Sequence, residues 1–132
     1  GVSVINVGII GYGYWGPNLV RNFAETSDIQ VAAVADLDSK KLALVQRRYP
    51  TVRTTTDHRD LFADPRVDAI AIATPVSSHF ELALAALRAG IHTILLPARN
   101  RKDLEEIPEN ARQQLEFIWL DTVDDALAAA LR

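Results

Sequence analysis

The sequence predicts the α/β class: a three-layer open parallel sheet with helices on both faces. Three observations predict this class. Short apolar runs alternate with helical patterns along the chain, which is typical of a parallel sheet covered on both sides. The connections between these segments are short. The first apolar run ends in a glycine-rich turn that leads straight into a helical pattern, and such a junction is common at the edge of these sheets.

The length of 132 residues suits a single domain over 1–132. Apolar residues make up 48% and charged residues 23%, as in an ordinary soluble globular protein. The net charge of −3, without a Lys/Arg cluster, argues against a nucleic-acid partner. The lack of cysteine excludes disulfides and thiolate sites. Without a membrane-spanning run or a leader, we expect a soluble, cytoplasmic protein. The lack of any methionine indicates a trimmed, recombinant start.

Apolar segments predict strands, in chain order, over 4–10, 30–35, 52–54, 67–73, 92–96 and 116–120. Several of them are apolar almost without interruption, so both of their faces should be buried, as in parallel strands. The second strand ends at Asp36. The fourth is closed by Thr74 and Pro75, because proline has no N–H for the strand ladder. The short third segment is predicted to be an edge strand.

Helical patterns predict helices, in chain order, over 15–26, 40–49, a short turn from 57, 81–89, 100–106, 108–114 and 123–131. Capping signals define their ends. Asp38 or Ser39 can cap the second helix. Ser78 opens a Ser-x-x-Glu capping box ahead of 81–89, which Gly90 terminates. The same spacing of a cap residue and an acid recurs at Asp57–Asp60, Asn100–Asp103 and Thr122–Asp125.

The glycine-rich turn has the spacing Gly-x-Gly-x-x-Gly, at Gly11, Gly13 and Gly16. Gly11 permits the sharp turn from strand to helix. Gly13 lets a diphosphate approach the backbone, and Gly16 lets the helix lie close to the strand. The following helix would direct its free N–H groups and its positive dipole end at the diphosphate. Asp36, at the end of the second strand, is placed to accept hydrogen bonds from the adenosine ribose.

This pattern predicts a binding site for NAD rather than NADP, because a carboxylate at Asp36 repels a 2′-phosphate. The nearby Lys40 and Lys41 weaken that preference. In the alternative interpretation the glycines form only a tight turn and Asp36 is a helix-capping acid.

Thr74 and Pro75 end the strand that should flank the first one where the strand order reverses, and ligands bind at this point in open sheets. The alternative interpretation is simple strand termination together with the Ser78 cap. For Ser77, Ser78 and His79 a plain capping role is as good an interpretation as a functional one. The aromatic residues Tyr12, Tyr14 and Trp15 either stack on a cofactor or pack in the core.

No nucleophile, base and orienting acid converge in the sequence, so we assign no catalytic residue. The histidines His58, His79 and His92 fall on separate segments without metal-ligand spacing. We therefore expect surface or packing roles for them and no metal site.

Several motifs carry a resemblance to a known family: Gly-Ile-Ile-Gly-Tyr-Gly-Tyr-Trp-Gly at 8–16, Ala-Val-Ala-Asp at 33–36, Ala-Ile-Ala-Thr-Pro-Val-Ser-Ser-His at 71–79 and Ala-Leu-Arg-Ala-Gly at 86–90. Over 4–89 the chain resembles the N-terminal half of the glucose–fructose oxidoreductase and inositol dehydrogenase family (Gfo/Idh/MocA). The resemblance implies a Rossmann domain that binds NAD(P). It implies that Gly11, Tyr12, Gly13, Tyr14 and Trp15 surround the diphosphate and nicotinamide side. It also places Asp36 at the ribose, and Thr74, Pro75 and His79 at the nicotinamide end.

The chain departs from that family at the next strand. The family's strand ends in Glu-Lys-Pro, with its lysine near the reacting carbon, whereas 94–100 reads Ile-Leu-Leu-Pro-Ala-Arg-Asn. The family's second domain, with its substrate pocket and catalytic histidine, has no counterpart in this sequence. We therefore expect dinucleotide binding without a complete catalytic apparatus.

The last third carries a different resemblance, in Arg-Ala-Gly-Ile-His-Thr-Ile-Leu-Leu-Pro-Ala-Arg-Asn from 88 and Leu-Glu-Phe-Ile-Trp-Leu-Asp-Thr-Val-Asp-Asp-Ala-Leu over 115–127. It is similar to the C-terminal part of the Lon protease proteolytic domain. Lon's catalytic serine and lysine lie upstream of this segment and match no position here, so no peptidase activity is implied.

The two resemblances meet in the alanine-rich helix before Gly90, a feature of both families. We interpret the chain as an engineered chimera, a single Rossmann-like domain with an oxidoreductase-derived part (1–89) and a Lon-derived part (90–132). The alternatives are a purely structural fold-recombination protein without a ligand and a natural, truncated NAD-dependent oxidoreductase domain.

Overall fold

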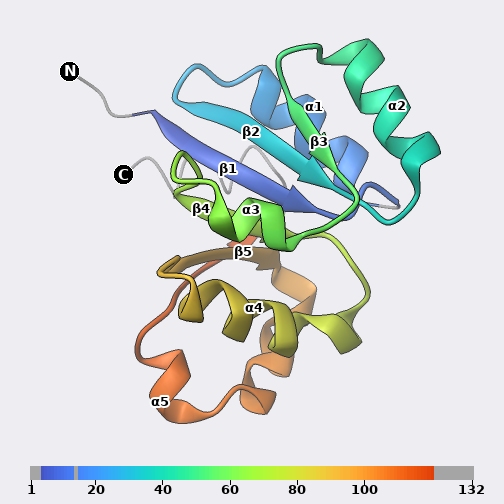
Figure 1. Ribbon diagram of the computed structural model, residues 1–132. Helices are drawn as coiled ribbons and strands as arrows, with labels where there is room; N and C mark the ends of the chain where they lie inside the picture. Colours follow the sequence, from blue (N-terminus) through green and yellow to red (C-terminus); the bar gives the residue numbers. More distant parts are fainter. Residues whose placement is uncertain (1–3, 14, 121–132) are drawn as a thin grey trace.

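The computed structural model describes residues 4–13 and 15–120. Its sheet has six strands, all paired in parallel, in the order β3-β2-β1-β4-β5-β6 (Figure 1). The strands are β1 (Ile5–Ile10), β2 (Ile29–Ala35), β3 (Arg53–Thr55), β4 (Ala69–Ile72), β5 (Thr93–Pro97) and β6 (Glu116–Leu120). The chain builds outward from β1 to β3, returns to the centre at β4 and builds outward again to β6. The predicted α/β class with an open parallel sheet is confirmed, and the winding reverses between β1 and β4.

Helices cover both faces of the sheet, which confirms the three layers (Figure 1). One face is covered by α1 (Gly16–Ala24) and α2 (Ser39–Arg48). The other face is covered by α3 (Arg59–Ala63), α4 (His79–Arg88), the 3₁₀ segments η1 (Val76–Ser78) and η2 (Ala98–Glu106), and α5 (Glu109–Arg112). Among the helices described, none has both the length and the apolar character that crossing a lipid bilayer requires.

The buried strands divide their side chains between two cores. In β4, Ala69 and Ala71 belong to the core under α1 and α2, whereas Ile70 and Ile72 belong to the core under α3 and α4. All of them are at most 2% exposed. The continuous apolar run in the sequence therefore reflects burial on both faces, because successive side chains of a strand point to opposite sides.

Two of the predicted capping boxes are wrong. Ser78 is the N-cap of α4, but its side chain makes no capping hydrogen bond, since η1 leads directly into the helix and Ser78 Oγ points back to the Pro75 carbonyl oxygen. Near α3, Asp57 Oδ1 does accept a 3.0 Å hydrogen bond from the Arg59 N–H, but the reciprocal contact is absent, because Asp60 accepts a hydrogen bond from Thr55 Oγ1 instead of the Asp57 N–H. The cap at Asp38 is confirmed, because its Oδ1 accepts a 2.9 Å hydrogen bond from the Lys40 N–H.

The last third of the described chain continues the sheet. β5 pairs with β4, and β6 pairs with β5 over five residue pairs. The short helix predicted over 100–106 is the 3₁₀ segment η2, and the helix predicted over 108–114 is the shorter α5. The helix predicted over 123–131, with its cap signal at Thr122 and Asp125, lies outside the described residues.

Candidate functional site

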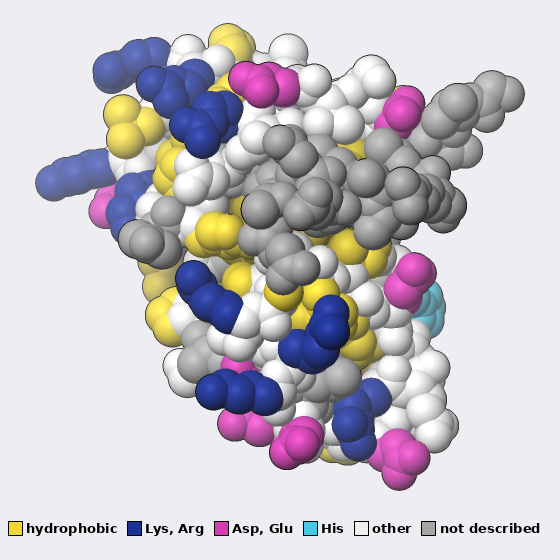
Figure 2. All heavy atoms as spheres, turned by 180° about the vertical axis from the view of Figure 1, so that it is seen from behind, with side chains coloured by type: hydrophobic (Ala, Val, Ile, Leu, Met, Phe, Trp, Pro, Cys, Tyr) yellow, Lys and Arg dark blue, Asp and Glu magenta, His cyan; other side chains and the backbone are white. Residues whose placement is uncertain are grey.

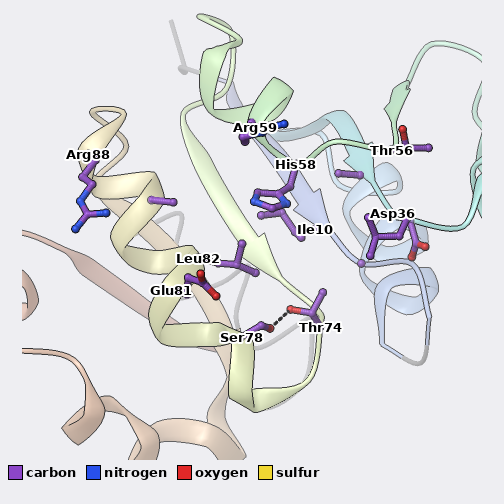
Figure 3. A pocket seen from close by; sticks show the side chains of 14 residues that line it. Ile10, Asp36, Thr56, His58, Arg59, Thr74, Ser78, Glu81, Leu82 and Arg88 are labelled. Carbon is purple, nitrogen blue, oxygen red and sulfur yellow. Dashed lines mark hydrogen bonds between the residues drawn. The ribbon is translucent and has the colours of Figure 1, made fainter.

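A pocket of about 560 Å³ lies at the carboxyl ends of β1, β2 and β4, on the α3–α4 face of the sheet (Figure 3). This volume is within the range of small-molecule sites. In open α/β sheets the reversal of winding leaves a crevice at this edge. Its lining comes from the ends of these strands and the turns that follow, and from α3 and α4: Ile10, Gly11, Ala35, Asp36, Leu37, Thr56, His58, Arg59, Thr74, Ser78, Glu81, Leu82, Ala85 and Arg88.

The glycine turn forms one end of this pocket and allows close packing between loops. Gly11 has φ +99°, which favours glycine, and a Cβ there would lie 2.9 Å from Thr74 Cγ2. A Cβ at Gly16 would lie 2.2 Å from the Gly11 carbonyl oxygen, so only glycine lets α1 begin this close to the turn. At Gly13 a Cβ would have only the Lys41 ammonium nearby, at 3.5 Å. The predicted turn and helix packing are confirmed, and Gly13 has open space.

Asp36 connects the glycine turn to the pocket. Its Oδ2 accepts a 2.7 Å hydrogen bond from the Tyr12 N–H, and its Oδ1 accepts a 2.8 Å hydrogen bond from the Asp38 N–H. An ionised carboxylate has about four lone-pair positions, so each oxygen keeps one for a ligand. The two bonds fix the carboxylate in the pocket wall, and Asp36 is half-buried there.

Thr74 projects into the pocket beside the glycine turn. Ser78 has a single hydroxyl proton, which it donates to the Pro75 carbonyl oxygen. Thr74 Oγ1 and Ser78 Oγ are also 2.6 Å apart, so in this second hydrogen bond Thr74 is the donor (Figure 3). Thr74 therefore presents an oxygen acceptor to the pocket. Pro75 is exposed in the turn before η1 and is not part of the lining.

His79 lies outside the pocket, although the resemblance placed it at the cofactor. It is 5% exposed and lines a separate small cavity with Asp103 and Glu106. Its Nε2 donates a 3.1 Å hydrogen bond to the Thr74 carbonyl oxygen, and its Nδ1 is buried without a partner among the described residues. Burial lowers the pKa of His79, against the carbonyl hydrogen bond. His79 therefore holds the Thr74 backbone from behind.

His58 is the site residue that sequence reasoning missed. We expected a surface or packing role for it, but it is half-buried in the pocket wall, which also includes Thr56 and Arg59 (Figure 3). Its ring packs edge-on against Phe62, with centroids 5.7 Å apart and an interplanar angle of 73°. The only signal in the sequence is its position three residues after the end of β3, at the carboxyl edge of the sheet.

The aromatic residues after Gly11 have different environments. The Tyr12 side chain is buried in the core under α1, and burial raises the pKa of its phenol. Trp15 packs against the same core at the start of α1. Tyr14 lies outside the described residues. For Tyr12 and Trp15 the structure therefore shows packing, and the Tyr12 backbone N–H, rather than its ring, is near the pocket.

The carboxyl end of β5 has no such site. Leu95 and Leu96, which precede Pro97 where the resembling family has glutamate and lysine, are each 3% exposed and belong to the two cores. No residue of β5 lines the described pocket. Within residues 4–13 and 15–120, no group of three His, Cys, Asp or Glu side chains is placed to hold a metal ion. On the face shown in Figure 2, Lys and Arg side chains lie in separate groups with acidic side chains beside them.

Two family models match the chain. Residues 5–96 match the oxidoreductase family with the NAD-binding Rossmann fold, and residues 72–132 match the Lon protease (S16) C-terminal proteolytic domain. The matches overlap over 72–96, which contains η1, α4 and most of β5. Each match extends beyond the boundary near 89 that the sequence suggested.

Individual relatives come from the same two families, but a Lon match can also extend far into the oxidoreductase-matched part of the chain. The uncharacterised oxidoreductase YdgJ of Escherichia coli is 39% identical over 92 residues, which cover 69% of this chain and 26% of that protein. The Lon protease of Methylocella silvestris is 54% identical over 59 residues, covering 45% of this chain and 7% of the protease. The Lon protease of Phenylobacterium zucineum is 34% identical over 110 residues, covering 80% of this chain and 14% of the protease. The chain thus spans between 7% and 26% of the length of each of these relatives.

Solved structures share the fold. An Agrobacterium radiobacter oxidoreductase, solved with NAD⁺, L-tartaric acid and magnesium, is 25% identical with a TM-score of 0.72, covering 90% of this chain and 36% of that one. The apo scyllo-inositol dehydrogenase of Lactobacillus casei has a TM-score of 0.74 at 24% identity, covering 88% of this chain and 36% of that one. With the family model over residues 5–96 and the reversed winding of the sheet, the chain belongs to the oxidoreductase family with an NAD-binding Rossmann fold.

Proposed function

We propose that this chain is a dinucleotide-binding domain that holds the adenosine diphosphate part of NAD and does not catalyse hydride transfer by itself. The observation that carries the proposal is the Asp36 carboxylate, fixed by the Tyr12 and Asp38 N–H groups in the wall of the pocket. Its two remaining acceptor positions suit the two hydroxyls of a ribose.

The residues around the glycine turn fit the other half of such a ligand. Gly13 leaves the backbone open to a diphosphate, and α1 begins at Gly16 with its free N–H groups. The Lys41 ammonium beside Gly13 adds a positive charge at the turn. NAD supplies hydride chemistry when bound, and the chain's own residues bind and orient it. We expect NAD to be preferred over NADP, because Asp36 would repel a 2′-phosphate.

The lack of catalysis is proposed from the end of β5. Leu95 and Leu96 are buried and offer no ionisable group where the family carries its lysine. We expect no gain of NADH absorbance when NAD⁺ is mixed with polyol or sugar substrates, and turnover above the buffer rate would contradict this part of the proposal.

The proposed origin is an engineered chimera in which a Lon-derived segment completes an oxidoreductase-derived sheet. The overlap of both family matches over 72–96 supports it, because α4 then fits either parent. A natural gene that encodes both segments in one reading frame would contradict it.

Isothermal titration with NADH and NADPH tests the binding. We expect saturable binding of NADH with a Kd of about 10 μM to 1 mM, which is roughly −4 to −7 kcal/mol. Asp36→Ala should weaken NADH binding at least about tenfold and reduce the preference over NADPH. Asp38→Ala is the matched control: it removes a nearby carboxylate and the cap of α2, and it should lower stability while leaving affinity unchanged. Equal affinity in wild type and Asp36→Ala would refute the ribose contact.

A further inference from the structure

A small cavity lies behind the pocket, between α4 and η2. Its polar lining is His79, the first residue of α4, and Asn100, Asp103 and Glu106, from η2. Its volume of about 10 Å³ is close to the least that one water molecule needs. The cavity therefore has no room for a larger ligand.

The imidazole of His79 leaves a hydrogen-bond acceptor in this cavity. Burial lowers the pKa of His79 below 6.5, so the ring is neutral at pH 7.5. Its one proton is on Nε2, because Nε2 bonds the Thr74 carbonyl oxygen at 3.1 Å and a carbonyl can only accept. Nδ1 then carries a lone pair, and it is buried without a partner among the described residues. A buried acceptor of this kind needs a donor.

The η2 side of the cavity is rich in acceptors. Asp103 and Glu106 are carboxylates, and the Asn100 amide donates to Asp103 Oδ2 at 3.1 Å. Of the two acids, Asp103 is half-buried and held by Asn100, whereas Glu106 is exposed. Asp103 also raises the pKa of His79 more than Glu106 does, while Arg99 lowers it. A ring nitrogen and a carboxylate that face one small space can be joined by a water molecule, which has two protons to donate.

The carbonyl group that His79 holds belongs to a residue of the 560 Å³ pocket, Thr74. Thr74 packs so closely against the glycine turn that a Cβ at Gly11 would lie 2.9 Å from its Cγ2. A displacement of Thr74 would therefore change the shape of the pocket beside the glycine turn.

We propose that one water molecule in the small cavity donates hydrogen bonds to His79 Nδ1 and to the Asp103 carboxylate, and that Asp103 is thereby a positioning residue for Thr74. By donating to Nδ1, the water keeps the ring proton on Nε2, where it bonds the Thr74 carbonyl oxygen. The effect on ligand affinity rests on the proposed function, whereas the water bridge stands on the cavity alone.

The bridge connects the two parts of the chain. Of the two family models, only that of the Lon protease domain covers Asp103, and only that of the oxidoreductase family covers Gly11 and Asp36. The segment after β5 therefore supports the dinucleotide site from outside the pocket.

A crystal structure and ¹⁵N NMR of the histidine rings test the bridge directly. We expect one ordered water within hydrogen-bond distance of His79 Nδ1 and of the Asp103 carboxylate. At pH 7.5 the NMR spectrum should show His79 with its proton on Nε2, and in Asp103→Ala the fraction with the proton on Nδ1 should rise. A dry cavity in the crystal, or a wild-type ring with its proton on Nδ1, would overturn the bridge.

Titration with NADH at pH 7.5 tests the effect on the pocket. Asp103→Ala should weaken binding about three- to fivefold, because Thr74 is less well held. Glu105→Ala is the matched control, since Glu105 is an exposed acid of the same segment that does not line the cavity. Its affinity should equal that of wild type.

The decisive variant combines Asp103→Ala with His79→Gln. Glutamine can donate to the Thr74 carbonyl oxygen but has no ring nitrogen in the cavity, so Asp103→Ala should change affinity by less than about 1.5-fold in this background. No loss from Asp103→Ala alone, or an equal loss in both backgrounds, would overturn the positioning role. Wild type that binds neither NADH nor ADP-ribose would overturn the proposed function and the positioning role, while a water in the cavity would still support the bridge.

Discussion

The carboxyl ends of β1 and β2 and the carboxyl end of β5 belong to one continuous parallel sheet, yet of these two regions only the first lines the 560 Å³ pocket. Gly11 and Asp36 directly follow β1 and β2, so the backbone turns sharply and a carboxylate stays accessible. In β5, Leu95 and Leu96 precede the last residue, Pro97, and are buried in the two cores. The comparison teaches that sheet continuity fixes the fold, while the residues that end each strand decide where a site exists.

The largest effect on stability is expected from the β5 end. Leu96→Ala should lower the free energy of unfolding by roughly 2–4 kcal/mol, because Leu96 is only 3% exposed and its removal leaves a cavity in the core. A fall in Tm of roughly 10 °C in a thermal scan corresponds to this loss. NADH affinity, measured where the variant is still folded, should not change. A large loss of affinity would mean that the β5 end belongs to the site after all.

In the glycine turn we expect a substitution to change NADH affinity more than stability. Gly11→Ala forces an L side chain to φ +99° and sets its Cβ 2.9 Å from Thr74 Cγ2, so we expect NADH binding to fall by about a hundredfold or become undetectable. Gly90→Ala is the control, because Gly90 has a similar φ of +89° but nothing within 4 Å of the added Cβ. It should lower stability by only about 1 kcal/mol and keep affinity. Similar binding in both variants would contradict the role of Gly11 in the site.

A substitution of Lys41 tests how much its positive charge contributes to NADH affinity at the glycine turn. Lys41→Ala should weaken NADH binding roughly three- to fivefold at low salt, and less at high salt, because its ammonium lies beside the open Gly13 backbone. Titrations at two salt concentrations measure the effect. Lys40→Ala removes an exposed neighbour and should leave affinity within error. An equal loss of NADH affinity in Lys41→Ala and Lys40→Ala would indicate a general electrostatic attraction rather than a local contact of Lys41.

The smallest effect is expected from His79, behind the pocket. Burial lowers its pKa below the ordinary 6.5, so the unfolded chain takes up the proton first as pH falls. Stability from the neutral ring is present above pH 6.5 and is lost on acidification toward the lower folded pKa. We expect a modest fall in Tm between pH 7.5 and 5.5 that His79→Gln removes, because glutamine can still donate to the Thr74 carbonyl oxygen. Asp103, Glu106 and Arg99 surround this ring, and the two acids oppose the shift. If Tm depended on pH in the same way in wild type and His79→Gln, the assignment of this effect to His79 would be refuted.

Much of the site was predictable because it depends on local backbone chemistry. Gly11 and Gly16 occur where a strand must turn into a helix at close range, and that requirement is visible in the sequence. Asp36 follows a buried strand and lies beside the turn as expected. The resemblance supplied the family, which the match over residues 5–96 confirms.

The direction of side chains at strand-to-helix junctions was not predictable. His79 was expected at the cofactor and His58 in a packing role, and the structure places His58 in the pocket wall and His79 behind it. The reason is that η1 and α4 rotate His79 toward η2, a segment about twenty positions later in the chain. Ser78 was similarly expected to cap α4, but its hydroxyl is drawn to Thr74 and Pro75.

The sequence by itself determined the alternation of elements, the glycine turn and the acid that follows β2, because local sterics and the apolar period act over a few residues. The tertiary structure decided that β5 and β6 extend the sheet beside β4, that Leu96 is sealed in a core and that His58 rather than His79 faces the pocket. These outcomes depend on contacts between segments far apart in the chain, and such packing determines which face of a residue remains open to a ligand.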